Sequence, residues 1–287
     1  MTDLPQFGDF EARFRGYGAA KIAILPIPFD KTSSWGKGAD KGPAALLDAS
    51  QYLENYDIET ETEVFRRGIY TAPPVLAEAP EAMIQQGCEA AAALLDAGKL
   101  VAAIGGEHSV TEGPLKACAA RHPGLSVLQL DAHGDRRSEY QGTPYSHACI
   151  MHRARQYADR IASVGVRSID ASERAALERD KIVYAWEAQT GGDWVRDTVG
   201  WLGEAVYVTI DLDCFDPSEL PATGTPEPGG LGWRTVLDVL RETARRRRVV
   251  GFDIVELCPD GTRPSPFLAA KLLYTFLSYI YAYNPPA

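Results

Sequence analysis

Short apolar runs alternate along the chain with longer segments whose apolar residues recur at helical spacing. The runs predict seven strands, at Lys21–Pro26, Leu100–Ile104, Ser126–Leu130, Arg160–Val166, Lys181–Ala185, Ala205–Ile210 and Arg248–Ile254. The intervening segments predict helices at Gly42–Leu53, Glu81–Ala97, Val110–Arg121, His147–Ala158, Ser172–Arg179, Asp193–Trp201, Trp233–Ala244 and Ser265–Tyr283. Such alternation favours an α/β fold with a mostly parallel sheet, and uniformly apolar strands indicate helices on both faces of it.

The length and spacing of these elements predict one domain over residues 1–287. A chain of 287 residues with 45% hydrophobic residues is long enough for a single large core. No repeat and no linker divides it. The longest loop-like stretch is Asp211–Gly232, which is rich in proline and glycine, and a long loop in a compact domain is usually functional.

Charge and cysteine content exclude several classes of protein. A net charge of −10 argues against sequence-independent nucleic-acid binding, which needs a basic surface. The segment Phe267–Tyr283 is apolar but is interrupted by Lys271, so it predicts a buried helix and no membrane partner. No signal peptide is visible at the start. Scattered cysteines without a Cys-x-x-Cys pair suggest free thiols in a reducing compartment, and hence a cytoplasmic protein; they are Cys88, Cys118, Cys149, Cys214 and Cys258.

Ionisable residues gather where the predicted strands end. Ligands of open parallel sheets bind at the carboxyl ends of the strands. The residues that follow four of the strands, or begin a helix nearby, are His108, Asp131, His133, Asp135, Asp211, Asp213, Glu256 and His147. Taken singly, each has an ordinary explanation as a buried histidine, a cap or half of an ion pair. Together, so many carboxylates at one edge are costly to bury unless cations lie between them.

The ligand types indicate the metal and the reaction. Oxygen and imidazole ligands without a thiolate favour manganese-like ions over a structural zinc site. Six such side chains are too many for one ion with an open position, and they suit two ions about 3.5–4 Å apart. A binuclear site activates water near neutral pH, so the pattern predicts metal-assisted hydrolysis.

Three segments resemble the signatures of the ureohydrolase family, which includes arginase and agmatinase. They are Gly105-Gly106-Glu107-His108-Ser109, Asp131-Ala132-His133-Gly134-Asp135 and Thr209-Ile210-Asp211-Leu212-Asp213. The resemblance implies an arginase-like three-layer α/β/α fold and two Mn²⁺ ions per chain. One ion would be held by His108, Asp131, Asp135 and Asp211, and the other by Asp131, His133, Asp211 and Asp213. Asp131 and Asp211 would then bridge the two ions.

The same resemblance implies roles for three further residues. His147 matches the family's proton-shuttle histidine, Glu256 matches the carboxylate that orients the substrate guanidinium, and Thr225 lies in the loop beside that pocket. The chemistry agrees, because a planar guanidinium suits a bidentate carboxylate and a histidine can deliver a proton near pH 7.

The segment Arg136–Tyr145 indicates what the substrate carries at the end away from its guanidinium group. It lacks the Asn-, Ser- and Thr-rich loop with which arginases hold an amino-acid head group, and it resembles short agmatinases. We therefore expect hydrolysis of agmatine to putrescine and urea. Glu139 or Glu227 would attract the distal ammonium, whereas Arg136 or Arg137 could instead bind a carboxylate.

Other readings stay open at this point. The substrate could be guanidinobutyrate, guanidinopropionate, aminopropylagmatine, guanidine or formiminoglutamate. A catalytically silent metal-binding homologue is a further alternative, as is a deacetylase-like amide hydrolase with one zinc. The resemblance also implies a homotrimer or homohexamer.

Overall fold

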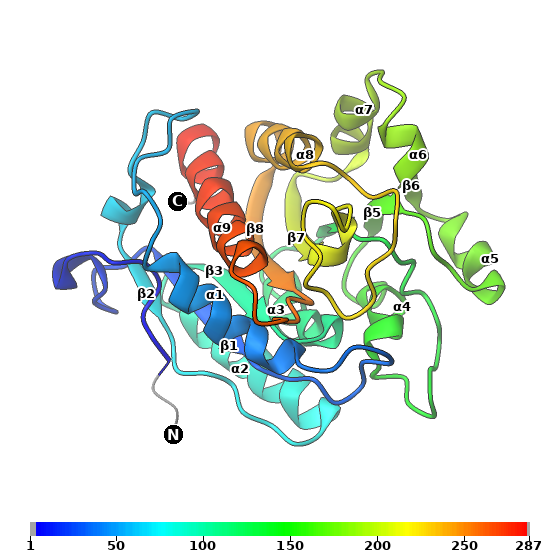
Figure 1. Ribbon diagram of the computed structural model, residues 1–287, viewed down its shortest axis with the longest axis horizontal. Helices are drawn as coiled ribbons and strands as arrows, with labels where there is room; N and C mark the ends of the chain where they lie inside the picture. The colour runs from blue at the N-terminus through cyan, green and yellow to red at the C-terminus, as the bar shows by residue number, and fades with distance from the viewer. Residues whose placement is uncertain (1–3, 286–287) are drawn as a thin grey trace.

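A single eight-stranded sheet runs through the computed structural model, which describes residues 4–285 (Figure 1). All neighbouring strands are parallel, in the order β2-β1-β3-β8-β7-β4-β5-β6. The strands are β1 Ile22–Ile27, β2 Ile69–Thr71, β3 Leu100–Gly105, β4 Ser126–Leu130, β5 Arg160–Val166, β6 Lys181–Tyr184, β7 Ala205–Asp211 and β8 Arg248–Val255.

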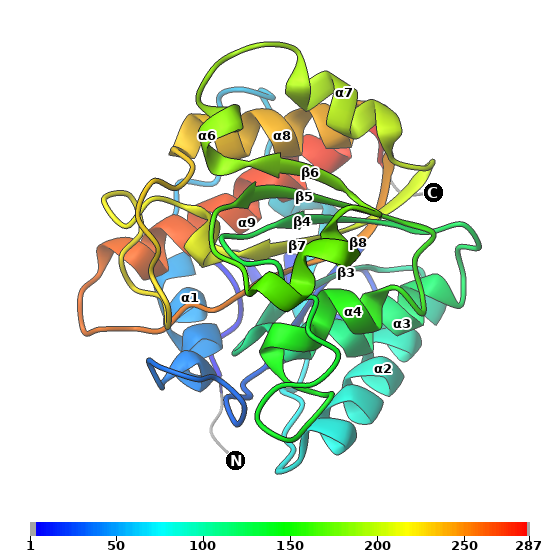
Figure 2. The same ribbon diagram turned by 90° about the vertical axis from the view of Figure 1, so that its right-hand side faces the viewer.

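Helices cover both faces of the sheet (Figure 2). One face carries α1 Gly42–Ser50, α7 Trp194–Trp201, α8 Trp233–Arg246 and α9 Pro264–Tyr283, and the other carries α2 Pro80–Asp96, α3 Glu112–Ala119 and α4 Ile150–Ala154. Short helices α5 Arg174–Leu177 and α6 Ala185–Ala188 lie near the β6 edge. Single 3-10 turns are η1 Ala12–Phe14, η2 Ala39–Lys41, η3 Val64–Arg67, η4 His108–Thr111, η5 His147–Cys149, η6 Ala171–Glu173 and η7 Leu212–Cys214. The predicted three-layer α/β/α fold is confirmed.

The uninterrupted apolar character of the strands follows from this double cover. Side chains alternate across a strand, so Ile22 and Ile24 of β1 enter the core under α1 and α9, while Ala23 and Leu25 enter the core under α2. The predicted C-terminal helix is also buried, and Phe276 packs edge-on against Phe252 of β8 at 4.8 Å between ring centroids. Among residues 4–285, no helix is long and apolar enough to cross a membrane.

Several elements differ from the sequence prediction. The predicted helices His147–Ala158 and Ser172–Arg179 are each a 3-10 turn followed by a short α-helix. The edge strand β2 was missed, because three residues before Pro73 and Pro74 are too short to show a pattern. The predicted strand Lys181–Ala185 ends at Tyr184, since Ala185 begins α6. There the Glu187 side chain accepts a hydrogen bond from the Tyr184 backbone N–H at 2.9 Å, which starts the helix.

The register of the central strands places the functional loops together. Leu130 of β4 pairs with Ile210 of β7, and Ile210 pairs with Ile254 of β8. Ile254 in turn pairs with Ile104 of β3. The carboxyl ends of four adjacent strands are therefore level, and the segments that follow them meet at one edge of the sheet.

Candidate active site

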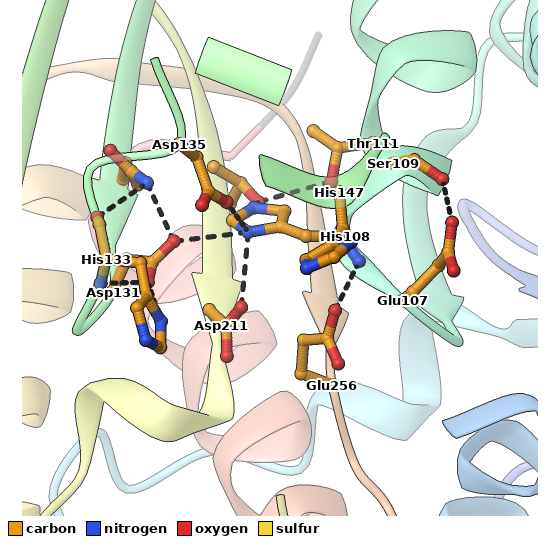
Figure 3. Close-up of polar contacts among 12 residues, drawn as sticks. Glu107, His108, Ser109, Thr111, Asp131, His133, Asp135, His147, Asp211 and Glu256 are labelled. Carbon is orange, nitrogen blue, oxygen red and sulfur yellow. Dashed lines mark hydrogen bonds and ion pairs between the residues drawn. The ribbon is translucent and has the colours of Figure 1, made fainter. Parts of the chain in front are cut away.

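A buried histidine stands among three carboxylates at this edge (Figure 3). The Nδ1 atom of His108 lies 3.1 Å from Asp131 Oδ2, 3.1 Å from Asp135 Oδ2 and 3.2 Å from Asp211 Oδ2. His108 starts η4 after β3, whereas the aspartates follow β4 and end β7. Residues from three strands thus form one compact cluster.

A second cluster shares Asp131 with the first. The Nδ1 atom of His133 lies 2.9 Å from Asp213 Oδ2 and 3.6 Å from Asp131 Oδ1. The ligand atoms of each cluster are close enough to hold one ion, with His108, Asp131 and Asp135 in the first cluster and Asp131, His133 and Asp213 in the second. The geometry therefore fits a binuclear site, and all six residues proposed from the sequence converge on it.

The hydrogen bonds of His108 test whether a metal suits the site. Thr209 Oγ1 donates to Asp253 Oδ1 at 2.6 Å and lies 2.8 Å from His108 Nε2. Because the hydroxyl proton points to Asp253, Nε2–H donates to Thr209 and the lone pair of Nδ1 faces the three carboxylates. That Nδ1 atom is buried without a hydrogen-bond partner among the described residues. A lone pair and three carboxylates facing one another suit a cation between them.

Burial raises the pKa of two of the aspartates. The pKa of Asp135 rises to about 6 through burial and the neighbouring Asp131, and burial with Asp213 and Asp131 raises the pKa of Asp211 well above its usual value. Without metal, the cluster therefore retains protons. Bound cations would take their place, which couples metal uptake to proton release.

A polar network behind the cluster orients Asp131. Its Oδ2 atom accepts a hydrogen bond from Gln129 Nε2 at 2.7 Å. The Oε1 atom of Gln129 accepts from Ser163 Oγ at 2.6 Å and from Arg136 Nη1 at 3.3 Å, and Arg136 Nε contacts Asp180 Oδ2 at 2.8 Å. The side chain of Arg136 is only 2% exposed and does not line the cavity, so its contacts do not support the alternative in which it binds a substrate carboxylate.

Two functional side chains depend on unusual backbone. Asp135 and Glu256 have φ angles of 53° and 64°, in the left-handed region that glycine adopts most easily, aspartate less often and glutamate only with strain. Gly106 holds the backbone at Glu256 in place. Its N–H donates to Ile27 O at 3.0 Å, and its carbonyl accepts from the Glu256 N–H at 2.8 Å. A Cβ on Gly106 would lie 2.0 Å from the carbonyl oxygen of Phe29. The Glu256 carboxylate accepts from the His108 N–H at 2.7 Å.

An open cavity of about 210 Å³ lies over the cluster. Its lining includes His147, Glu256 and Thr225, the residues for which the sequence suggested roles in catalysis or substrate binding, and Thr225 Oγ1 lies 3.5 Å from Asp213 Oδ2. The Arg136–Tyr145 segment contributes Arg137 and Tyr140 to the wall. The other wall residues include Trp35, Asp170 and Glu173.

Two acids that the sequence suggested for binding the distal ammonium of the substrate, Glu139 and Glu227, lie elsewhere. Glu139 does not line this cavity; it lines a neighbouring depression with Ser138 and His152. Glu227 approaches His133, with 3.8 Å between Glu227 Oε1 and His133 Nε2. Two further carboxylates that line this cavity, Asp170 and Glu173, were not singled out from the sequence. They follow β5, and their signal was the same as for the metal ligands: acids just past a predicted strand.

Asp253 was also missed. It is a fully buried acid in the middle of β8, where it accepts hydrogen bonds from Tyr207 at 2.7 Å and Thr209 at 2.6 Å. An acid inside an apolar strand was a visible signal, because a buried carboxylate needs partners.

Comparison with known proteins agrees with this geometry. Residues 20–278 match the model of the Arginase family. The chain belongs to the arginase family. This ureohydrolase is 38% identical to an N(1)-aminopropylagmatine ureohydrolase of Synechocystis sp., over 96% of this chain and 93% of that protein. It is 35% identical to an agmatinase of Pyrococcus horikoshii, over 89% and 90% of the two chains.

A solved structure shows the same fold. The ureohydrolase superposes on the agmatine ureohydrolase of Thermoplasma volcanium with a TM-score of 0.87 and 30% sequence identity, over 98% of this chain and 96% of that one. The family assignment makes this arginase-family chain a hydrolase of C–N bonds in linear amidines, with a guanidino compound as its substrate class.

Proposed function

We propose that the protein releases urea from a guanidino polyamine, with N(1)-aminopropylagmatine as the preferred substrate. The observation that carries the proposal is a cavity lined by carboxylates in addition to the metal-ligand candidates. They are Glu256, Asp170 and Glu173. A guanidinium with further ammonium groups along its tail complements this distribution of charge. Relatives named for this substrate support it, at 37–38% identity.

Agmatine is the second candidate. It carries the same guanidinium with a single distal ammonium, and the agmatinase of Pyrococcus horikoshii is nearly as similar in sequence. The acidic wall is partly balanced by Arg137, which lies 3.6 Å from Glu173 and 3.8 Å from Asp170. Arginine suits the cavity less well, since an α-carboxylate would face acidic side chains.

The proposed ligands are those of the two clusters. His108, Asp131, Asp135 and Asp211 would hold one ion, and Asp131, His133, Asp211 and Asp213 the other. Their oxygen and imidazole donors favour manganese. When bound, a metal pair supplies water activated for attack on the guanidinium carbon.

Two side chains of this site would complete the reaction. Glu256 accepts the guanidinium N–H groups and so orients the carbon for attack. Burial is the main reason that the pKa of His147 is lowered, to about 4, so the ring is neutral at pH 7. A neutral imidazole accepts the proton that the attacking water loses and passes it to the departing amine. Urea and a polyamine leave with all protons accounted for.

Urea release tests the assignment. Manganese-loaded protein is assayed with N(1)-aminopropylagmatine, agmatine, arginine and 4-guanidinobutyrate at equal concentrations. Both polyamine substrates should exceed arginine by at least about 10²-fold in kcat/KM. Comparable rates with arginine, or activity confined to 4-guanidinobutyrate, would contradict the proposal.

A variant of the cavity lining separates the two candidate substrates. Asp170→Asn should raise KM for N(1)-aminopropylagmatine by about 2–5-fold, the size expected for an exposed ion pair, and should change KM for agmatine less. Asp193→Asn, which removes an exposed, arginine-paired acid outside the cavity, is the control. Equal effects of Asp170→Asn on the two substrates would favour agmatine.

A further inference from the structure

Glu107 is a buried acid that the proposed chemistry does not use. It lies between Gly106 and the metal-ligand candidate His108, yet its side chain points away from the carboxylate cluster and toward Ser109 (Figure 3). Its exposed fraction is 0%. Within residues 4–285, no lysine, arginine or histidine side chain forms an ion pair with it. A buried carboxylate without a cation needs other donors.

Four donors surround this carboxylate, and three of them belong to one distant loop. Oε2 accepts from the backbone N–H of Thr32 at 2.5 Å and of Ser33 at 2.8 Å. Oε1 accepts from the Thr32 hydroxyl at 2.5 Å and from the Ser109 hydroxyl at 2.6 Å. Glu107 therefore fastens the loop after β1 to the end of β3.

The Thr32 hydroxyl connects this anchor to His147. Because its proton points to Glu107, its oxygen is free to accept, and the His147 backbone N–H donates to it at 3.0 Å. The same oxygen lies 3.4 Å from His147 Nδ1, and Ser146 Oγ lies 3.2 Å from that nitrogen. The imidazole is thus held from the side of Thr32 and Ser146, with Tyr140 edge-on at 6.0 Å between ring centroids.

We propose that Glu107 is a positioning residue, which acts through Thr32 to hold the His147 imidazole at the cavity wall. This inference rests on the proposed function, in which His147 transfers the proton. The loop that Glu107 holds continues through Ser33, Ser34 and Trp35, which line the same cavity. One carboxylate therefore fixes both a wall of the cavity and the group that moves the proton.

The kinetics of three variants test whether Glu107 positions His147 through Thr32. Glu107→Gln keeps the size of the side chain but turns an N–H₂ group toward donors, and Thr32→Val removes the hydroxyl. Each should lower kcat about 10–100-fold, within the range for a misplaced acid–base group, and leave KM within about 3-fold and two metals bound. Thr32→Ser keeps the hydroxyl and should restore most of kcat. Ser109→Ala removes a Glu107 hydrogen bond outside the loop and is the matched control.

A double variant shows whether Glu107 acts through His147 or affects the whole site. Groups that act as a unit are not additive, so Glu107→Gln should cost less than about 3-fold in a His147→Ala background. An equal loss in both backgrounds would overturn the proposal, since Glu107 would then act without His147.

Two measurements do not depend on turnover. Trypsin should cleave at Lys31 or Lys37 faster in Glu107→Gln and Thr32→Val than in the wild type and Ser109→Ala. The imidazole ¹H–¹⁵N spectrum should show the His147 signal, assigned by its loss in His147→Ala, shifted in the same two variants. If no guanidino compound releases urea, the proposed function fails and these two measurements still decide the positioning role. Unchanged cleavage together with an unshifted signal would overturn it.

Discussion

Replacing Arg136 with methionine should destabilise the protein strongly, although the residue touches no substrate in the proposed reaction. The side chains of Arg136 and Asp180 are 2% and 1% exposed, and 2.8 Å separates Nε from Oδ2. Removing one partner of a buried pair typically costs about 3–5 kcal/mol, because the other charge is left in a poor environment. Arg155 also contacts Asp180 and remains in place in the variant. We therefore expect a loss of unfolding free energy at the lower end of this range, about 3 kcal/mol.

Differential scanning calorimetry of the metal-free protein measures this effect. For a chain of this size, about 3 kcal/mol corresponds to a fall in Tm of roughly 6–12 °C. Arg137→Met is the matched control: its side chain is 31% exposed, and its acidic partners are 3.6 and 3.8 Å away. Both contacts are long and the guanidinium is partly exposed, so they should contribute about 0–1 kcal/mol and the Tm should fall less than in Arg136→Met.

The network predicts a second effect of Arg136→Met. Gln129 would keep its hydrogen bond from Ser163 but lose the one from Arg136, and the Asp131 carboxylate that it orients would be less well fixed. Metal affinity, measured by titration calorimetry, should fall by about 10–100-fold. A Tm within 2 °C of the wild type would refute the reasoning, taking about 2–4 °C per kcal/mol as the scale. A raised KM confined to carboxylate-tailed guanidines would restore Arg136 as a tail anchor.

Three other changes have defined outcomes. Asp131→Asn should weaken both metal positions, since Asp131 belongs to both clusters; metal analysis that shows one full position would contradict a shared ligand. His147→Ala should lower kcat by about 10²–10⁴-fold with metal content unchanged, and an unchanged rate would exclude its role in proton transfer. Gly106→Ala should cost at least about 3 kcal/mol of stability, because its Cβ would meet the Phe29 carbonyl at 2.0 Å; a soluble variant with wild-type Tm would show that the backbone can move aside.

The sequence predicted most of the sheet and the centre of the site, for related physical reasons. Long apolar runs identify buried strands, and acids just past them stand out because burial makes them costly. The residues that orient the site were harder to find. Thr209 and Gln129 are ordinary in composition, and their importance appears only when strands distant in the chain become neighbours. Asp170 and Glu173 also follow a predicted strand, but the Arg136–Tyr145 segment, which supplies a different part of the wall, has the more conspicuous composition.

The left-handed backbone at Asp135 and Glu256 has a consequence for engineering this enzyme. Glycine would relieve about 1–2 kcal/mol of strain at Glu256 and less at Asp135, so a screen for heat resistance alone would favour those substitutions. Each would at the same time delete a carboxylate that has a role in the proposed reaction. Selection for thermostability and selection for turnover therefore oppose each other at these two residues, and a library built for stability should hold both fixed.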